Sequence, residues 1–214
     1  MHCNYKIYHN DSYLLISCDR TQMNKNFARI LVEENEIAEF LNNPSPLFNE
    51  KDKLNTLIVC EQPGEAICSL LDKLDIVIAG GGIVTNEQDE LLLIFRRGKW
   101  DLPKGKIELN EEIINGAMRE VEEETGVKIL SVTEKPVITY HTYKLKGKDC
   151  LKETNWFHMK AKNGQQNLTP QLEEDIEKAC WVKKTDLEQY KNGCYPLVWD
   201  LVSGGFVSDP TDCD

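Results

Sequence analysis

Four glutamates stand within five positions near the middle of the chain: Glu120, Glu122, Glu123 and Glu124. Three of them have i, i+3, i+4 spacing, which places the carboxylates of Glu120, Glu123 and Glu124 on one face of a helix. Like charges so close repel one another, and the negative end of the helix dipole disfavours them further. A hard divalent cation such as Mg²⁺ or Mn²⁺, which prefers oxygen ligands, would offset this repulsion. The cluster therefore predicts a metal site.

The flanking residues predict the helix that presents these carboxylates. Asn110 is a good N-cap, and Leu109 and Ile114 are spaced for a hydrophobic staple across the first turn. Gly126 supplies a left-handed stop at the other end. The apolar stripe expected to pack this helix consists of Ile113, Ile114, Ala117, Met118 and Val121.

The same segment resembles the Nudix box. That box is a Gly, five residues, a Glu, seven residues, and then Arg-Glu-aliphatic-x-Glu-Glu-x-Gly-aliphatic. Its defined positions are filled here by Gly105, Glu111, Arg119, Glu120, Val121, Glu123, Glu124, Gly126 and Val127. An ordinary solvated acidic helix has no reason to match all nine positions. The segment is therefore identified as similar to the Nudix hydrolase family.

This resemblance implies a metal-dependent pyrophosphohydrolase that cleaves a nucleoside diphosphate linked to another group. Divalent metals neutralise the pyrophosphate charge and lower the pKa of bound water. Arg119 and Glu111 are implied as a supporting ion pair that holds the preceding loop against the helix. The implied metal ligands are Glu120, Glu123, Glu124 and a backbone carbonyl near Lys104 or Gly105.

The base that activates water is left open by the resemblance, which allows it either in the box or in a loop before a late strand. Glu173 and Glu174 lie in such a loop, just before Trp181. Both are candidates for the base, and both are equally well explained as loop carboxylates in solvent.

Basic residues surround the start of the box. Lys104 and Lys106 flank Gly105, and Arg96 lies where the preceding strand is expected to end. Ammonium and guanidinium groups placed there would hold phosphate oxygens. The run Leu-Pro-Lys-Gly-Lys also resembles the entrance of Nudix members that act on diadenosine polyphosphates and diphosphoinositol polyphosphates.

Tyr143, sixteen residues after Val127, bears on the substrate. A Tyr at this distance resembles the diadenosine polyphosphate group, in which it stacks on a base, although strand packing explains it equally well. We therefore expect a dinucleoside polyphosphate or a related polyphosphorylated substrate. The alternatives are ADP-ribose or another nucleotide sugar, a damaged nucleoside triphosphate, and a Nudix domain that senses a ligand without hydrolysing it.

Composition limits the remaining classes of function. The 214 residues carry a net charge of −11, which argues against DNA binding because such binding rests on basic patches. The eight cysteines form no C-x-x-C pair, so a zinc site is not expected. The sequence shows no signal peptide and no apolar run long enough to cross a membrane. We expect a cytoplasmic protein with free thiols.

The arrangement of predicted elements indicates an α/β fold. Strands before and after the box helix, and a second helix late in the chain, suggest a sheet between helices. The resemblance implies a Nudix-like α/β/α sandwich with a mixed sheet over residues 74–202, followed by a flexible tail at 203–214. Within the first strand, residues 76–84, the glycines at 80–82 predict a bulge or close backbone packing rather than a phosphate loop.

Residues 1–73 predict a small α+β unit of unknown role. A hairpin is expected over residues 5–17, helices over 30–40 and 64–74, and a buried strand over 54–60. The sequence leaves open whether this unit is the arm of a homodimer or part of the substrate pocket.

Overall fold

The computed structural model describes residues 4–43, 55–162 and 167–204. These residues form two compact units, one of residues 4–43, 55–77 and 139–153, the other of residues 78–138, 154–162 and 167–204. The domain limits predicted from the sequence, 1–73 and 74–202, differ from these units because they place residues 139–153 with the glutamate cluster. The predicted domains themselves remain a prediction. Residues 205–214 of the predicted tail lie outside the described part of the chain.

The first unit combines a hairpin, two further strands and two helices. Its elements are β1 (Asn4–His9), β2 (Ser12–Ser17), the 3₁₀ helix η1 (Arg20–Asn24), β3 (Arg29–Leu31), α1 (Glu34–Asn42), β4 (Thr56–Val59), α2 (Pro63–Leu71), most of β10 (Val137–Leu145), and the first residues of β5 (Asp75–Thr85) and β11 (Lys148–Ala161). β1 and β2 form the predicted antiparallel hairpin, with Ile7 opposite Leu14. β4 runs parallel to β2 and β3, and β1 runs parallel to β10. The two helices pack on each other, and α2 also contacts β1 and β2.

The first predicted helix of this unit begins later than expected. Residues 29–31, at the start of the predicted range, form β3 and pair with β4, and α1 begins only at Glu34. Pairing with a neighbouring strand therefore overrides the local helical pattern at these positions. The rest of the prediction is confirmed, since Ile37, Phe40 and Leu41 of α1 are buried.

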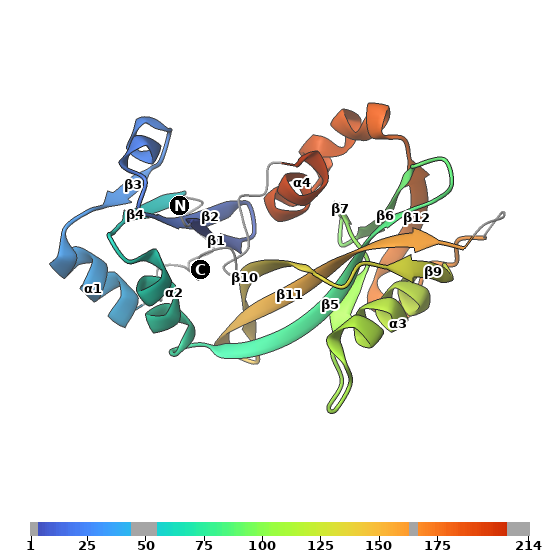
Figure 1. Cartoon of the computed structure of the whole chain (residues 1–214), viewed down its shortest axis with the longest axis horizontal. Coiled ribbons are helices and arrows are strands. Elements are labelled where there is room, and N and C mark those ends of the chain that lie inside the picture. The colour runs from blue at the N-terminus through green and yellow to red at the C-terminus, as the bar shows by residue number, and fades with distance from the viewer. Residues whose placement is uncertain (1–3, 44–54, 163–166, 205–214) are drawn as a thin grey trace. The chain divides into compact units, whose positions relative to one another are not determined.

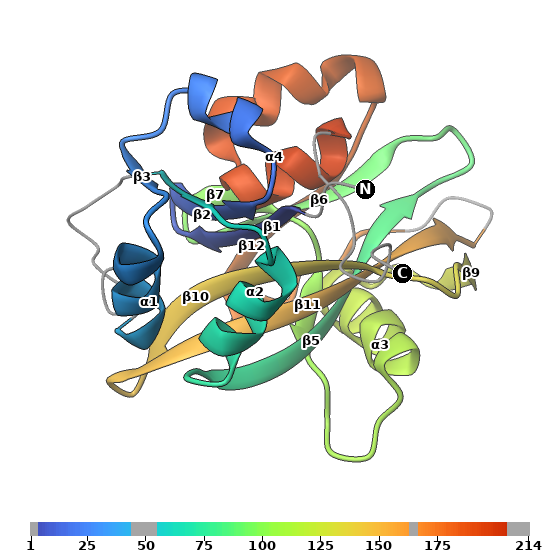
Figure 2. The same cartoon turned by 60° about the vertical axis from the view of Figure 1, so that its left-hand side comes forward.

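The second unit places a sheet between helices. Its elements are β5 (Asp75–Thr85), β6 (Leu91–Arg96), β7 (Lys99–Asp101), β8 (Lys104–Lys106), α3 (Ile113–Thr125), β9 (Ile129–Val132), β11 (Lys148–Ala161), the 3₁₀ helices η3 (Leu172–Glu174) and η4 (Lys184–Gly193), β12 (Ile176–Val182) and α4 (Pro196–Ser203). The strand order is β12-β6-β5-β11, and β7, β8 and β9 pair with β6, β5 and β11 respectively. Figure 1 and Figure 2 both show α3 and α4 on opposite sides of these strands. The predicted α/β/α sandwich is thus confirmed.

The core of this unit lies between α3 and the sheet. Its buried residues are Val84, Leu92, Ala117, Val121, Val127, Ile129, Phe157, Met159 and Ala161. A Cβ atom added to Gly80 or Gly82 of β5 would overlap Ala117 or Val121 of α3. The glycines therefore let the helix approach the strand closely, which confirms the prediction of close backbone packing. No helix of the described residues combines the length and the apolar character needed to cross a bilayer.

Candidate functional site

The helix that carries the glutamate cluster, α3, begins two residues later than the sequence predicts. Its N-cap is Glu112, whereas Asn110 has a φ of 65° in the preceding turn. Leu109 is 92% exposed, so the predicted hydrophobic staple is wrong, and Ile113 lies outside the packed stripe. The C-terminal prediction is confirmed, because Gly126 has a φ of 75° and its N–H donates to the carbonyl of Glu122 at 2.8 Å.

Arg119 joins three carboxylates. Its Nε and Nη2 donate to the two oxygens of Glu111 at 2.8 and 2.9 Å, the forked geometry that matches a guanidinium to a carboxylate. Its Nη1 donates to Glu120 and to Glu123, both at 2.8 Å, and Nη2 reaches the carbonyl of Lys106 at 3.2 Å. The hydrogen bonds from Arg119 and from the Glu108 N–H lower the pKa of Glu111 to about 2. Glu111 and Arg119 thus form the expected ion pair and tie the loop to α3.

Glu120 lies directly against the backbone of Gly105. A Cβ atom at position 105 would overlap the Glu120 carboxylate, so any other residue there would displace this carboxylate from its present position. Gly105 is held in β8, opposite Gly80 of β5. Burial raises the pKa of Glu120, and the negative charges of Glu123 and Glu174 raise it further. The contact with Arg119 acts to lower it, but the net shift is upward. The box glycine therefore leaves room for a carboxylate that is half-buried and close to other negative charges.

Glu124 is the most deeply buried carboxylate of the cluster, with 1% of its surface exposed. The backbone N–H of Lys104 donates to its Oε2 at 2.8 Å, and Arg96 Nη1 lies 3.5 Å from its Oε1. Burial raises the pKa of Glu124 to about 7, although Lys104 and Arg96 both act to lower it. A group in this environment is stabilised by any cation that comes into contact with it.

The two lysines beside Gly105 have different environments. The Nζ of Lys104 donates to the buried carboxylate of Asp101 at 2.8 Å, whereas Lys106 is exposed and only its backbone carbonyl takes part in the contacts of Arg119. Burial would raise the pKa of Asp101, but the Lys104 ammonium and the Leu102 N–H lower it overall. Sequence reasoning missed Asp101, and its i, i+3 spacing to Lys104 is the only signal that could have indicated it.

The loop before β12 contributes one of the two predicted base candidates to this network. Glu174 lies 3.6 Å from Arg96 Nη2, and Arg96 also contacts Glu124, so Glu174 is connected to the cluster through one guanidinium. Glu173 is exposed on the same turn, η3. Tyr143 belongs to the first unit, where its ring lies 5.7 Å from that of His141.

The residues of the cluster fit a hard divalent cation by their donor type. Glu120 lies against Gly105, and Glu124 accepts a hydrogen bond from the Lys104 N–H. Glu123 is joined to Glu120 through Arg119, so the three carboxylates belong to one contact network of oxygen donors. In the described residues, however, no three acidic, His or Cys side chains are already arranged around one point as a metal cage. Arg119 instead occupies oxygens of Glu120 and Glu123. Metal binding at these carboxylates would therefore replace contacts that Arg119 makes here.

The different environments of the two lysines predict different effects on stability. Lys104→Ala is expected to lower the free energy of unfolding by about 3 kcal/mol, because it leaves the Asp101 carboxylate buried without its cation. Lys106→Ala removes an exposed side chain and should change it by less than about 0.5 kcal/mol. Urea denaturation of both variants measures the difference. The double variant Lys104→Ala, Asp101→Asn should recover part of the loss, because it removes the buried charge as well as its partner. Equal stability of Lys104→Ala and Lys106→Ala would contradict the pairing of Lys104 with Asp101.

The family described as NUDIX domain matches residues 76–198. Nudix hydrolase 8 of Arabidopsis thaliana is 30% identical over 106 residues, which are 46% of this chain and 29% of that protein. The 8-oxo-dGDP phosphatase NUDT18 of Mus musculus is 43% identical over 63 residues, 25% of this chain and 20% of that protein. The chain therefore spans less than a third of the length of either relative.

Among solved structures, the MutT NUDIX hydrolase from Burkholderia pseudomallei is similar to this chain with a TM-score of 0.49 and 21% sequence identity. The match covers 60% of this chain and 97% of that one.

Proposed function

The chain belongs to the Nudix family, and from this membership we propose that it is a divalent-metal-dependent hydrolase of phosphoric anhydride bonds in nucleoside diphosphate derivatives. The observation that supports this most is the contact network of three glutamates of α3: Glu120 lies against Gly105, Arg119 bridges Glu120 and Glu123, and Glu124 accepts from the Lys104 N–H. Such a concentration of negative charge destabilises a helix terminus unless cations offset it. Binding a divalent metal ion would supply the missing positive charge, part of which then faces the pyrophosphate.

Each residue of the site has a proposed task. Glu120, Glu123 and Glu124 hold Mg²⁺ or Mn²⁺, which when bound neutralises pyrophosphate charge and acidifies water. Arg119 keeps the loop after β8 fixed to α3 through its fork to Glu111 and its bond to the Lys106 carbonyl. The Lys104 N–H orients the Glu124 carboxylate by donating to its Oε2.

We assign the base that takes the proton from the attacking water to Glu174. Its carboxylate contacts Arg96, which also contacts Glu124, so it is anchored beside the cluster while its side chain stays about half exposed to water. Glu173, one residue earlier on η3, is exposed and serves as the matched control because the two side chains are chemically identical. A carboxylate with access to both water and substrate meets the geometric need of a general base.

For the substrate we propose a dinucleoside polyphosphate or a related polyphosphorylated nucleotide. Lys106 is exposed beside the cluster and free to meet additional phosphates, and Tyr143 remains the proposed stacking partner for a base. A second candidate is an oxidised nucleoside diphosphate, because the mouse relative is named an 8-oxo-dGDP phosphatase. A homodimer and a cytoplasmic location also remain predictions.

A hydrolysis screen with Mg²⁺ and with Mn²⁺ tests this function. The substrates are diadenosine tetraphosphate, ADP-ribose, a nucleotide sugar, a nucleoside triphosphate and 8-oxo-dGDP, and phosphorus NMR identifies the bond that is cleaved. We expect the highest kcat/KM on the dinucleoside polyphosphate, because it carries the longest run of charge for Lys106 and the metal to meet. Glu174→Gln should lower kcat by about 100-fold, within the range of general-base effects, and Glu173→Gln should leave it nearly unchanged.

Two outcomes would reject parts of the proposal. Equal kcat values for Glu173→Gln and Glu174→Gln would remove Glu174 from the role of base while leaving the hydrolase assignment intact. Binding of these compounds without turnover of any of them, in the presence of either metal, would instead favour the alternative of a ligand-sensing Nudix domain.

A further inference from the structure

A pocket of about 350 Å³ opens in the second unit, away from the carboxylate cluster. It is lined by residues of β5, β9 and β11, by Asp89 in the turn before β6, and by Lys184 at the start of η4. Gly80 and Gly82 of β5 face α3, so the alternating residues Ile83 and Thr85 lie on the opposite face of the sheet. The pocket therefore opens on the face that α3 does not cover.

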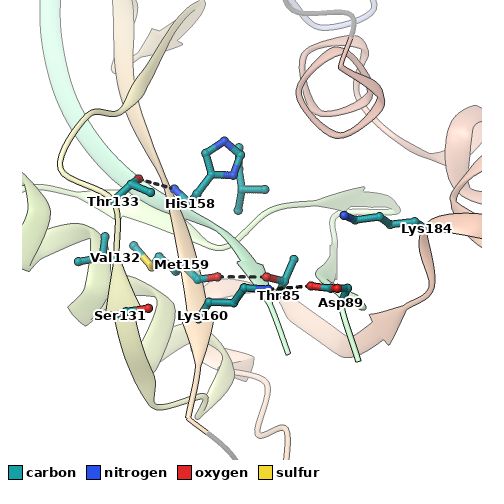
Figure 3. Close-up of a pocket in the computed structure, with 10 residues that line it drawn as sticks. Thr85, Asp89, Ser131, Val132, Thr133, His158, Met159, Lys160 and Lys184 are labelled. Atoms are coloured by element: carbon teal, nitrogen blue, oxygen red, sulfur yellow. Dashed lines mark hydrogen bonds and ion pairs between the residues drawn. The ribbon is translucent and has the colours of Figure 1, made fainter. Parts of the chain in front are cut away.

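The charges around this pocket do not cancel. Lys160 donates to Asp89 at 2.7 Å, which leaves this pair close to neutral. Within the described residues, the Lys184 ammonium and the His158 ring make no hydrogen bond and no ion pair, although the Lys184 charge helps to lower the pKa of Asp89. The hydrogen bonds between His158 and Thr133 use only the backbone N–H and carbonyl of His158. Figure 3 shows Lys184 extending from η4 toward the side of the pocket where His158 stands. An excess of hydrogen-bond donors thus faces the same space.

The remaining lining shows what kind of molecule these donors suit. Ser131 adds a hydroxyl at the β9 side, and Ile83 adds apolar surface, whereas the Val132 side chain packs against the core beneath α3. A Lys ammonium binds phosphate as a point charge, and hydroxyl and imidazole groups donate further hydrogen bonds to its oxygens. The volume lies at the lower end of the range of small-molecule sites, about 300 to 1,000 Å³.

We propose that this pocket binds a phosphate group through Lys184, His158 and Ser131. The group belongs either to a small phosphomonoester, whose uncharged part rests on Ile83, or to free inorganic phosphate. The Lys160–Asp89 pair forms one wall and keeps Asp89 from repelling the anion.

The pocket is separate from the carboxylate cluster. Asp89 precedes the first residue of β6, Leu91, whereas Arg96 at the other end of the same strand contacts Glu124. Five residues of extended chain span about 17 Å, so one phosphate group cannot contact both places. The two sites also lie on opposite faces of the sheet, because Gly82 and Val84 of β5 face α3 while Ile83 and Thr85 face the pocket. Binding at the pocket is therefore expected to be independent of the metal carboxylates.

The test is a titration of the full chain in EDTA, so that no metal can carry phosphate to the carboxylates. The probes are inorganic phosphate, AMP and adenosine, and the readout is the ring C–H signals of the histidines in ¹H–¹³C NMR spectra. We expect phosphate and AMP to shift one histidine signal, that of His158, to saturation, and adenosine to leave it unchanged. His158→Gln assigns the signal by removing it. A dissociation constant at least threefold smaller for AMP than for phosphate would point to a phosphomonoester, and equal constants would point to phosphate itself.

Two neighbouring lysines provide a matched control. Lys184→Gln should weaken binding about tenfold, equivalent to about 1.4 kcal/mol, whereas Lys183→Gln makes the same change in net charge outside the pocket and should leave the affinity unchanged. Glu123→Gln should also leave it unchanged. Equal weakening by Lys183→Gln and Lys184→Gln would reduce the effect to general charge attraction and overturn the proposal. Binding of adenosine as tight as that of AMP, or a His158 signal that never saturates, would overturn it as well.

Discussion

Replacing Glu123 with glutamine is expected to lower kcat in Mg²⁺ by at least about 100-fold while the protein stays folded. The substitution keeps the size of the side chain and removes one of the negative charges proposed to hold the metal, whose stabilisation of transition-state charge amounts to several kcal/mol. Glu123 is about half exposed and contacts Arg119, which keeps its fork to Glu111 in the variant. The measurement is steady-state hydrolysis of the substrate found in the screen, with circular dichroism to confirm folding.

The adjacent residue supplies the control for this experiment. Glu122 lies on the same helix but turns to Lys128, with 2.6 Å between Oε2 and Nζ, and takes no part in the cluster around Gly105. Glu122→Gln should therefore keep kcat within about twofold of the wild type, because an exposed ion pair contributes little. If Glu123→Gln retained normal turnover, or if both variants lost it equally, Glu123 would have no specific role in holding the metal.

The box helix could be predicted from the sequence because its signals are local. The i, i+3, i+4 spacing placed the carboxylates of Glu120, Glu123 and Glu124 together, and a glycine at 126 sufficed to end the helix. The start of the helix could not be predicted this way. Asn110 has the right side chain for an N-cap, but the carboxylate of Glu111 is held by Arg119 from eight residues further along. This contact fixes the loop in a turn and delays the helix to Ile113.

The interactions around the cluster depend on residues that only the folded chain brings together. Lys104 and Lys106 look equivalent in the sequence, yet one ammonium is bound to buried Asp101 and the other is exposed. The sequence predicts the pair of Arg119 with Glu111, and in the structure Arg119 also joins Glu120 and Glu123. The link from Glu174 through Arg96 to Glu124 combines η3, β6 and α3, and no local pattern encodes the contacts between them.

The metal-free protein is expected to lose stability as the pH rises from about 5 to 8, and Glu124 is expected to cause a distinct part of that loss. Burial raises the pKa of Glu124 to about 7 in the folded chain, against about 4.5 for an unperturbed glutamate. A folded-state pKa above the unfolded value means that the folded state holds the proton more tightly. This contribution to stability is fully present below pH 4.5 and is lost as the pH passes through 7. For a shift of this size it amounts to about 3 kcal/mol.

Other carboxylates titrate in the opposite sense, since contacts lower the pKa of Asp101 and of Glu111 in the folded state, so the comparison must isolate Glu124. Glu124→Gln keeps an oxygen for the Lys104 N–H but has no charge to bury. In EDTA, the free energy of unfolding of this variant should match the wild type near pH 5 and exceed it by up to about 3 kcal/mol at pH 8.

Millimolar Mg²⁺ should restore much of the wild-type stability at pH 8 and raise that of the variant less, because the native cluster binds the cation and the unfolded chain binds it weakly. A difference between the two proteins that does not change with pH would show that the Glu124 carboxylate is not held in an unfavourable buried state, and an equal response to Mg²⁺ would place the metal away from it.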